Sequence, residues 1–536
     1  MAGANKLEAV LIQRFPACAR PLVWQDKVNE TRGARATRGA KDMRTAIIAG
    51  LAALVAGCAT DTAPLALDAR ERCAAFDGSA LGLAGPTPTW HAAEIAMPAF
   101  CEVTGTLRPV AGSNIGVVYR LPENWNGKVY GTGGGGWIGN IALQTVSDAL
   151  GRGYATMQTD GGHPIGDVWD NSWAVDEEAA KDFSYRAIHA MTAAGKRVAA
   201  RFYGKPHSRA YYVGCSTGGR MGLMEAQRYP ADYDAIVAGA PVYTLQTQTS
   251  SVLRTNVFTK SGGFSAGDLE LAEDAALAAC DADDGLRDGL INDPRKCTWD
   301  PVTIQCSGAK TDTCLSAPQV QALQTLYAGI KAPDGQWAML PMSRGGESSW
   351  SFFVATDGKG IDPTRGGGLV GLEPVIFQNR AVDWANFSPE ADVPHVRASA
   401  FAALYEAKST DLSAFFGRGG KLLMWHGESD AGPSPVGSND YARAILAANP
   451  RAASQYRHFP APGVGHCAGG PGADVLPLLE TIERWDETGR APDLLVGTKR
   501  DGSLTRPHCA WPKVARYKGA GDANDPTSWS CVDRGA

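Results

Sequence analysis

Two separate stretches of the chain alternate short apolar runs with longer helix-like patterns. The predicted strands are residues 117–119, 128–131, 154–158, 210–213, 235–238, 421–426 and 456–459. The predicted helices are residues 177–202, 219–229, 440–448 and 474–485. Parallel strands need long crossover connections, usually helices, so this order indicates a mostly parallel, doubly wound sheet. The chain is therefore predicted to have an α/β fold.

An irregular segment separates the two alternating stretches. Residues 242–400 contain Gly, Pro, Trp and four Cys without a clear period. We predict that this segment is a lid inserted between two parts of one domain, residues 59–241 and 401–536. Residues 1–58 are predicted to precede the fold as an upstream segment and an export signal.

The export signal is predicted from a short basic start and an apolar run of eleven residues, 46–56. Such a run is too short to span a bilayer, which takes about 20 helical residues, but it fits a secretory signal. Residues 55–58, Val-Ala-Gly-Cys, resemble a bacterial lipobox, which would make Cys58 a lipidated membrane anchor. An ordinary signal peptide cleaved nearby is the alternative, and translation from Met43 is the simplest explanation of residues 1–42.

The twelve cysteines favour an oxidising compartment, because the chain has no Cys-x-x-Cys pair that would indicate a metal site. Ten cysteines remain after Cys18 and Cys58 are set aside. Proximity predicts four disulfides and elimination predicts a fifth: Cys73–Cys101, Cys280–Cys297, Cys306–Cys314, Cys509–Cys531 and Cys215–Cys467.

The pattern Gly-x-Ser-x-Gly occurs twice, around Ser216 and around Ser265. Ser216 follows a predicted strand and precedes a predicted helix, and this context raises a nucleophilic serine above the edge of a sheet. Ser265 has no strand before it and has Asp268 three residues later, which is typical of a helix N-cap. Ser216 is therefore the predicted nucleophile.

A serine nucleophile needs a histidine base, which in turn is oriented by an acid. In this architecture the order along the chain is Ser, then Asp or Glu, then His. His466 lies in a loop of small residues after a predicted strand, and Asp430 follows the strand 421–426. The alternatives for the acid are Glu428 and Asp440. The other nearby histidines, His426 and His458, lie in strands and are predicted to be structural.

Two of the cysteines adjoin the predicted nucleophile and base. Cys215 precedes Ser216, and Cys467 follows His466. If Ser216 and His466 are neighbours, these two cysteines are within reach of a disulfide. The search for cysteine pairs and the search for catalytic residues therefore lead independently to the same two segments.

The developing negative charge on an ester carbonyl requires preorganised backbone donors. The N–H of Thr217 is one predicted donor, and Gly135 and Gly136 in the glycine-rich loop 131–137 are candidates for the other. A phosphate-binding loop is the rival interpretation, but no Lys-Ser/Thr pair follows to complete it.

An acidic loop at residues 280–291 places carboxylates at short intervals between glycine turns. Ca²⁺ binds six to eight oxygen ligands, so the loop predicts a structural calcium site, although it lacks the last Glu of an EF-hand. The predicted ligands are Asp281, Asp284, Asp288 and the carbonyl oxygens of Leu286 and Leu290. A solvated acidic turn is the alternative.

Together these motifs resemble the tannase and feruloyl esterase family, which includes mono(2-hydroxyethyl) terephthalate hydrolases. The motifs that carry the resemblance are residues 133–137, 159–163, 182–189, 214–219, 281–291, 465–467 and 506–509. The resemblance implies an α/β-hydrolase fold, a triad of Ser216, Asp430 and His466, the neighbouring disulfide, calcium in the lid and oxyanion donors from the glycine loop and Thr217. Residues 431–435 depart from the bulkier apolar segment that family members often have there.

The predicted function is hydrolysis of esters of phenolic acids, such as galloyl or feruloyl esters, with Ca²⁺ as the only cofactor. Lid aromatics are candidates to stack on the acyl ring: Trp337, Trp350, Phe352 and Phe353. Arg380 and Arg397 are candidates for binding the free carboxylate of a terephthalate monoester. The alternatives are a non-catalytic surface lipoprotein that binds phenolics or glycans, a terephthalate monoesterase and a peptidase. The net charge of −5, from 51 basic and 56 acidic residues, argues against a nucleic-acid partner.

Overall fold

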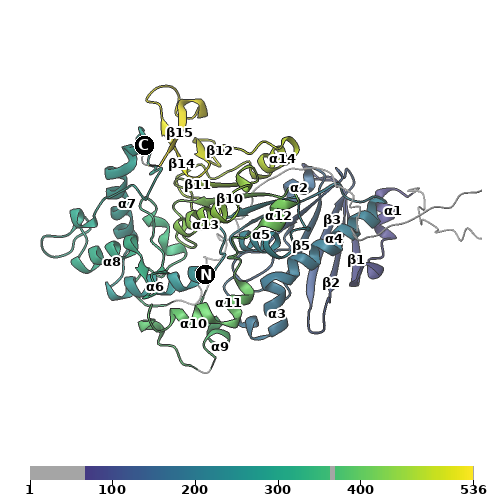
Figure 1. Ribbon diagram of the computed structural model, residues 1–536, viewed down its shortest axis with the longest axis horizontal. Helices are drawn as coiled ribbons and strands as arrows, with labels where there is room; N and C mark the ends of the chain where they lie inside the picture. Colours follow the sequence, from purple (N-terminus) through teal and green to yellow (C-terminus); the bar gives the residue numbers. More distant parts are fainter. Residues whose placement is uncertain (1–66, 362–367, 379, 535–536) are drawn as a thin grey trace, which may run out of the picture.

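The computed structural model describes residues 67–361, 368–378 and 380–534. A nine-stranded sheet forms the centre of the fold (Figure 1), in the order β1-β2-β3-β5-β4-β6-β7-β10-β11. Its strands are β1 (Leu83–His91), β2 (Phe100–Leu107), β3 (Ile115–Pro122), β4 (Lys128–Thr132), β5 (Ala155–Thr159), β6 (Arg209–Cys215), β7 (Ala235–Gly239), β10 (Lys421–Gly427) and β11 (Tyr456–Ala461). Three two-stranded sheets are formed by β8 (Ile330–Lys331) with β9 (Trp337–Met339), β12 (Leu494–Thr498) with β13 (Thr505–Cys509), and β14 (Lys513–Tyr517) with β15 (Trp529–Asp533).

The helices of the first part of the chain are α1 (Ala69–Ala74), α2 (Ser147–Gly151), α3 (Glu177–Lys181), α4 (Ala187–Tyr203) and α5 (Thr217–Arg228). Those between β7 and β10 are α6 (Gln246–Lys260), α7 (Ala266–Cys280), α8 (Ala317–Ala328), α9 (Glu373–Ile376), α10 (Val393–Ala398), α11 (Ala400–Tyr405) and α12 (Ser413–Gly417). Two more helices, α13 (Pro435–Ala448) and α14 (Leu478–Thr488), follow β10 and β11.

The strands from β5 to β11 pair in parallel, whereas β1, β2 and β3 form an antiparallel edge that joins β5. The predicted α/β fold with a mostly parallel sheet is confirmed. The antiparallel edge was not predicted, because β1 contains Gly85, Pro86 and Pro88, residues that favour loops and edge strands. An edge position tolerates these residues.

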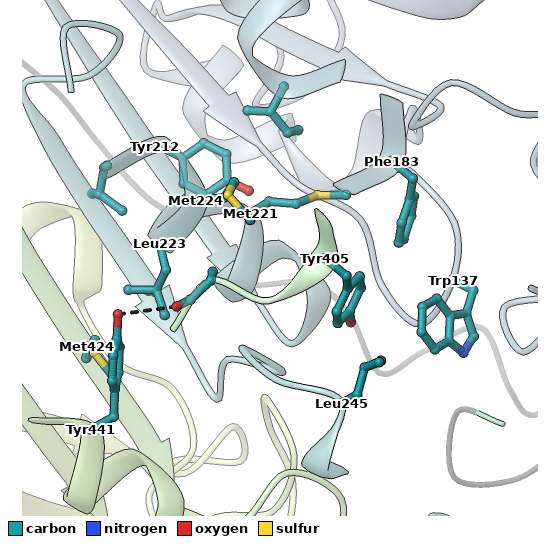
Figure 2. Close-up of a cluster of buried hydrophobic side chains, with 14 of the residues drawn as sticks. Trp137, Phe183, Tyr212, Met221, Leu223, Met224, Leu245, Tyr405, Met424 and Tyr441 are labelled. Carbon is teal, nitrogen blue, oxygen red and sulfur yellow. Dashed lines mark hydrogen bonds between the residues drawn. The ribbon is translucent and has the colours of Figure 1, made fainter. Parts of the chain in front are cut away.

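Each parallel strand buries side chains on both faces, as expected of a sheet covered by helices on both sides. On β6, Tyr212 points into the core beneath α5, while Tyr211 and Val213 belong to the core on the opposite face, with α14. Figure 2 shows the first of these cores, in which Tyr212 and Met221 lie close together. These two cores hold the ends of the strands in fixed positions.

Strands β7 and β10 are parallel neighbours, although residues 240–420 lie between them in sequence. The intervening chain forms the helices α6–α10 at the left and bottom of Figure 1 before it returns to the sheet. The boundaries 242–400 for the lid remain a prediction.

Helix α13 begins at Pro435 rather than at the predicted residue 440, and two further helices also differ from the predicted ranges. The single helix expected at 177–202 is interrupted by a π-helical turn, Asp182–Arg186, in which Asp182 accepts a hydrogen bond of 2.7 Å from Ser113 Oγ. The helix expected from residue 474 begins at Leu478, because Asp474 instead accepts a hydrogen bond from the Gly469 N–H and Pro477 precedes the first turn. In both places a buried carboxylate accepts a hydrogen bond from a residue in a loop, and the regular helix is interrupted or begins later.

Candidate active site

Ser216 occupies the sharp turn between β6 and α5. Its backbone has φ 62° and ψ −125°, a conformation that is strained for a residue with a side chain. A Cβ atom on Gly214 would lie only 2.4 Å from the Gly218 carbonyl oxygen, so the strand and helix can meet this closely only through glycine. This is the strand-turn-helix context of a nucleophile elbow.

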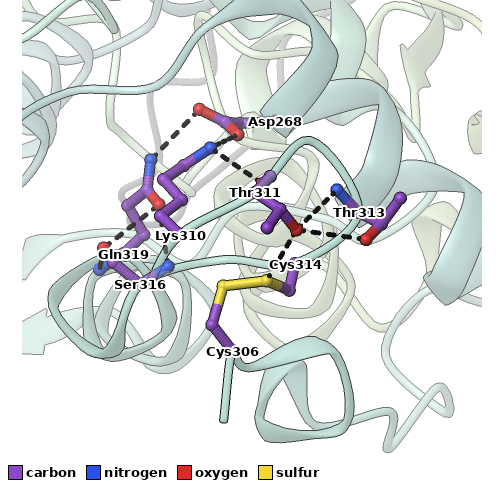
Figure 3. The surroundings of a disulfide bond; sticks show 8 residues. All are labelled: Asp268, Cys306, Lys310, Thr311, Thr313, Cys314, Ser316 and Gln319. Atoms are coloured by element: carbon purple, nitrogen blue, oxygen red, sulfur yellow. Dashed lines mark hydrogen bonds and ion pairs between the residues drawn. A yellow bond between two sulfur atoms is a disulfide. The ribbon is translucent and has the colours of Figure 1, made fainter. Parts of the chain in front are cut away.

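Ser265, the serine of the second Gly-x-Ser-x-Gly pattern, is the N-cap of α7. Its hydroxyl accepts from the Asp268 N–H at 3.1 Å, and Asp268 in return accepts from the Ser265 N–H at 2.9 Å. Asp268 also binds Lys310 and Gln319 beside the Cys306–Cys314 disulfide (Figure 3). The predicted N-cap is confirmed, and Ser265 has a structural role.

Asp430 and His466 are joined by a hydrogen bond of 2.6 Å between Oδ2 and Nδ1. Asp430 follows β10 and its side chain is fully buried, while its Oδ1 accepts from the Gly432 N–H at 2.8 Å. Burial opposes ionisation of Asp430, but the charge of His466 and hydrogen bonds from His426 and His466 lower its pKa to about 2. Asp430 is therefore an anion that orients the imidazole through a fixed contact.

A second histidine, His426, also contacts this carboxylate. His426 is fully buried at the end of β10, with Nε2 3.1 Å from Asp430 Oδ2 and Nδ1 2.7 Å from Ser438 Oγ. Its position in a strand had indicated only a structural role. Sequence reasoning missed this contact, because it depends on the turn that follows β10.

We expect His426→Leu to lower kcat for ester hydrolysis by roughly 10- to 100-fold, the cost of one hydrogen bond to a charged group. His458→Leu is the matched control, because His458 is buried on the neighbouring strand β11 and binds Asn439 rather than Asp430. Steady-state kinetics and melting temperatures of both variants distinguish an effect on the position of Asp430 from an effect on the stability of the fold. Equal losses of kcat in the two variants would contradict a role for His426.

The Cys215–Cys467 disulfide brings the neighbourhoods of Ser216 and His466 together. Its two Cα atoms are 6.0 Å apart, although 252 positions separate them in sequence. Within the described residues, Ser216 Oγ and His466 share no hydrogen bond. Contacts of this kind are often long without substrate and tighten when it binds. The other four predicted pairs also form disulfides: Cys73–Cys101, Cys280–Cys297, Cys306–Cys314 and Cys509–Cys531.

The alternatives for the acid have other partners. Glu428 is fully buried and accepts two hydrogen bonds from Arg295, at 2.6 and 2.5 Å. The Asp440 side chain is 44% exposed and pairs with Arg443 at 2.8 Å. Neither forms a hydrogen bond or ion pair with His466 in the described part of the chain.

A buried arginine supports the loop that carries Asp430. Arg254 of α6 donates to the carbonyl oxygens of Ala431 and Gly432, each at 3.0 Å, and to that of Leu340 at 3.0 Å. Sequence reasoning had not singled out this residue, because only the folded chain brings α6 next to the loop after β10. Arg254 therefore links residues after β10 to the segment between β7 and β10.

The glycine-rich loop after β4 lies against the start of α5. Gly134 O accepts from the Gly218 N–H at 2.9 Å, and Gly136 O accepts from Thr217 Oγ1 at 2.6 Å. Open space lies beside Gly135, where an added Cβ would meet nothing within 4 Å. No carbonyl among the described residues accepts the N–H of Gly135, Gly136 or Thr217. The predicted donors are thus gathered beside Ser216.

Phe353 packs on the candidate base. Its ring lies 4.7 Å from that of His466 in an edge-to-face arrangement and 6.0 Å from Trp169. A Cβ on Gly432 would approach the Phe353 ring to 3.1 Å, so the small segment 431–435 leaves room for this aromatic side chain. Among the other predicted lid aromatics, Trp350 is buried in the core, while Phe352 is 51% exposed.

The acidic loop gathers three partly buried carboxylates. Burial and the neighbouring Asp288 and Asp281 raise the pKa of Asp284 to about 7. Asp281 accepts from the N–H groups of Asp288 and Gly289, each at 3.1 Å, and Asp288 Oδ2 pairs with Arg506 at 2.6 Å. Asp288 Oδ1 is buried without a hydrogen-bond partner. Three neighbouring carboxylates with one cationic partner, Arg506, and a buried oxygen without a hydrogen bond fit a bound cation.

Three predicted residues remain outside this site. Arg380 pairs with Asp392 at 2.6 Å and Arg397 with Asp334 at 2.7 Å. Cys58 and the predicted signal lie outside the described residues. No helix in the described part of the chain is long and apolar enough to cross a membrane.

Comparison with known proteins places this geometry in a family. The family model described as tannase and feruloyl esterase matches residues 101–350 and 371–532. The chain is 34% identical to mono(2-hydroxyethyl) terephthalate hydrolase of Piscinibacter sakaiensis, over 82% of this chain and 86% of the relative, and 33% identical to a probable feruloyl esterase of Arthroderma benhamiae, over 81% and 85%. The crystal structure of feruloyl esterase B from Aspergillus oryzae superposes with a TM-score of 0.77 at 27% identity, covering 87% of this chain and 100% of that one. The chain therefore belongs to the tannase and feruloyl esterase family and is a carboxylic ester hydrolase.

Proposed function

We propose that this enzyme hydrolyses esters of phenolic acids, such as galloyl or feruloyl esters, through Ser216, His466 and Asp430. Ser216 attacks the ester carbonyl while His466 takes its proton and later donates it to the leaving alcohol. Water then attacks the acyl-enzyme, with His466 again as the base and Asp430 holding the imidazole. The observation that carries this proposal is the buried Asp430–His466 hydrogen bond beside the disulfide that adjoins Ser216.

The oxyanion of each tetrahedral intermediate would accept hydrogen bonds from the Thr217 N–H and from Gly135 or Gly136. The open space beside Gly135 and the free N–H groups support this role. Donors fixed in place before the reaction stabilise charge without reorganisation.

Phe353 supports an aromatic acyl group. Its ring packs on His466 and against Trp169, so a planar acyl ring attached to Ser216 would meet aromatic surfaces. The names of the relatives include feruloyl esterases and a terephthalate monoester hydrolase, and the second activity is therefore the alternative substrate class.

Side-by-side assays of methyl gallate, methyl ferulate, mono(2-hydroxyethyl) terephthalate and 4-nitrophenyl acetate test the proposal. We expect the highest kcat/KM for a phenolic ester. Phe353→Ala should lower the kcat/KM for phenolic esters relative to that for 4-nitrophenyl acetate about 10-fold, because one aromatic contact worth ~1.5 kcal/mol is lost. Highest turnover of the terephthalate ester would select the alternative class. Cleavage of peptides without esters, or binding of phenolics without turnover, would overturn the assignment.

A structural Ca²⁺ in the acidic loop is a second part of the proposal. Asp281, Asp284 and Asp288, with the carbonyl oxygens of Leu286 and Leu290, would hold the ion. Within the described residues these two carbonyls accept no hydrogen bond. The ion would neutralise the carboxylates and fix the loop, and it has no part in the chemical steps.

Chelation should lower the melting temperature, and added Ca²⁺ should restore it. The pKa of Asp284 in the folded protein is raised to about 7, so the free energy of unfolding without Ca²⁺ falls as pH rises from the unfolded pKa toward 7. Stabilisation by Ca²⁺ should therefore be largest above about pH 7. Differential scanning calorimetry with and without Ca²⁺ measures both effects. In Asp284→Asn the melting temperature should not respond to Ca²⁺, and a full response would contradict the site.

Export of the protein, with lipidation of Cys58, is the remaining proposal. Residues 46–58 support it, since they combine a short apolar run with a lipobox-like ending. Mass spectrometry of the mature N-terminus tests it, because a diacylated Cys58 and an unmodified cleavage site differ in mass.

A further inference from the structure

A second cluster of polar side chains lies at the far end of α5 from Ser216. It consists of His189 on α4, Glu225 on α5 and Asp232 in the turn before β7. One ligand atom from each residue lies within 4.8 Å of the others, and no other group of three such residues in the described part of the chain is gathered as closely. Three elements of the fold therefore meet at this point.

Glu225 is the most unusual member of the cluster. It is 1% exposed, and its carboxyl group lies beside that of Asp232, while no donor or cation among the described residues pairs with either of its oxygens. The nearby Lys196 donates to the Asp232 carbonyl oxygen but forms no ion pair with Glu225 among the described residues. The buried Glu428, by contrast, is held by Arg295. Two carboxyl groups buried side by side cannot both stay ionised, so either a proton or a bound cation must neutralise them.

The side chains of His189 and Asp232 contact each other beside Glu225. His189 Nδ1 lies 2.6 Å from Asp232 Oδ2, and Tyr229 stacks on the imidazole with ring centroids 3.8 Å apart. The His189 side chain is 38% exposed, which leaves a path from solvent, whereas that of Asp232 is 13% exposed. The cluster thus combines an oriented imidazole, two neighbouring carboxyl groups of which Glu225 has no cationic partner among the described residues, and access for an ion.

We propose that His189, Glu225 and Asp232 bind a transition-metal dication of the Zn²⁺ type, with water as the fourth ligand. An imidazole with two carboxylates suits Zn²⁺ better than Ca²⁺ or Mg²⁺, which prefer oxygen ligands alone. Glu225 is nine residues after Ser216 on α5, about 13 Å along the helix axis. The ion would therefore not touch the reacting ester; it would tie α4, α5 and the turn before β7 together.

The test uses the full-length enzyme in saturating Ca²⁺, so that the acidic loop does not compete for the added metal. Zn²⁺ is titrated against a chromophoric zinc chelator, and melting temperatures are recorded with and without Zn²⁺. Wild type should bind one equivalent and melt at a higher temperature with it, because a ligand that binds only the folded state stabilises that state. Ca²⁺ and Mg²⁺ should not replace Zn²⁺.

Two variants and one control identify the site. His189→Ala and Glu225→Gln should each weaken Zn²⁺ binding by ~100-fold or more. Glu225→Gln keeps the shape of the side chain and removes a carboxylate ligand. His395→Ala, which removes an exposed histidine on α10, should bind Zn²⁺ as wild type does. Absence of zinc binding in wild type, or unchanged binding in either site variant, would overturn the proposal.

Discussion

Ser216→Ala is expected to lower kcat for ester hydrolysis by ~10⁴- to 10⁶-fold, with little change in the melting temperature. Without the hydroxyl no acyl-enzyme can form, and only the residual contribution of the oxyanion donors and substrate binding remains. The side chain is partly exposed at the end of β6, so removal of one oxygen atom leaves the core intact. Burst kinetics with 4-nitrophenyl acetate, followed by mass spectrometry of trapped acyl-enzyme, measure the effect.

Ser265→Ala is the matched control, since Ser265 belongs to the same sequence pattern and caps α7. Its kcat should equal that of wild type, while the loss of an N-cap should cost about 1 kcal/mol of stability. Retention of ester turnover in Ser216→Ala would remove Ser216 as the nucleophile. Loss of turnover in Ser265→Ala without loss of stability would favour the other serine.

The double variant Cys215→Ala/Cys467→Ala is expected to have the largest effect on stability. A disulfide that closes a loop of 252 residues is worth roughly 5 kcal/mol in the chain-entropy model. The same disulfide fixes the neighbours of Ser216 and His466, so kcat should fall together with stability. Urea unfolding and steady-state kinetics of the double variant measure the two losses.

The double variant Cys306→Ala/Cys314→Ala provides the comparison. Its disulfide closes only 8 residues, for which the same model gives about 2.5 kcal/mol, and it lies beside the α7 N-cap rather than beside His466 (Figure 3). We expect a smaller loss of stability and an unchanged kcat. Equal effects of the two double variants would show that neither loop length nor location determines what the Cys215–Cys467 disulfide contributes.

The disulfide framework and the parallel strands could be predicted from the sequence because both depend on local signals. Four of the five cysteine pairs are close in sequence, so only one pair had to be found by elimination. The elbow around Ser216 combines a buried strand, small residues and a helix within 20 positions. The Ser265 N-cap is equally local, since its partner is Asp268.

The residues that sequence reasoning missed act through contacts between distant segments. Arg254 meets Ala431 only when α6 packs beside the loop after β10, and Glu225 meets His189 only when α4 and α5 pack side by side. His426 lies four positions before Asp430, but alternation along a strand gives no reason for the two to touch. Their contact depends on the turn that follows β10.

The hydrogen bonds of Arg254 bear on how a substrate reaches Ser216. A guanidinium that is 1% exposed and holds three carbonyl oxygens cannot separate from them without leaving those groups unpaired. Arg295, whose side chain is 29% exposed, and the buried Glu428 form a second crosslink between the same two parts of the chain. The segment between β7 and β10 is therefore held in place against the residues that follow β10. Adaptation to new esters would proceed by substitution of side chains on this segment that face the substrate rather than by a change in its motion.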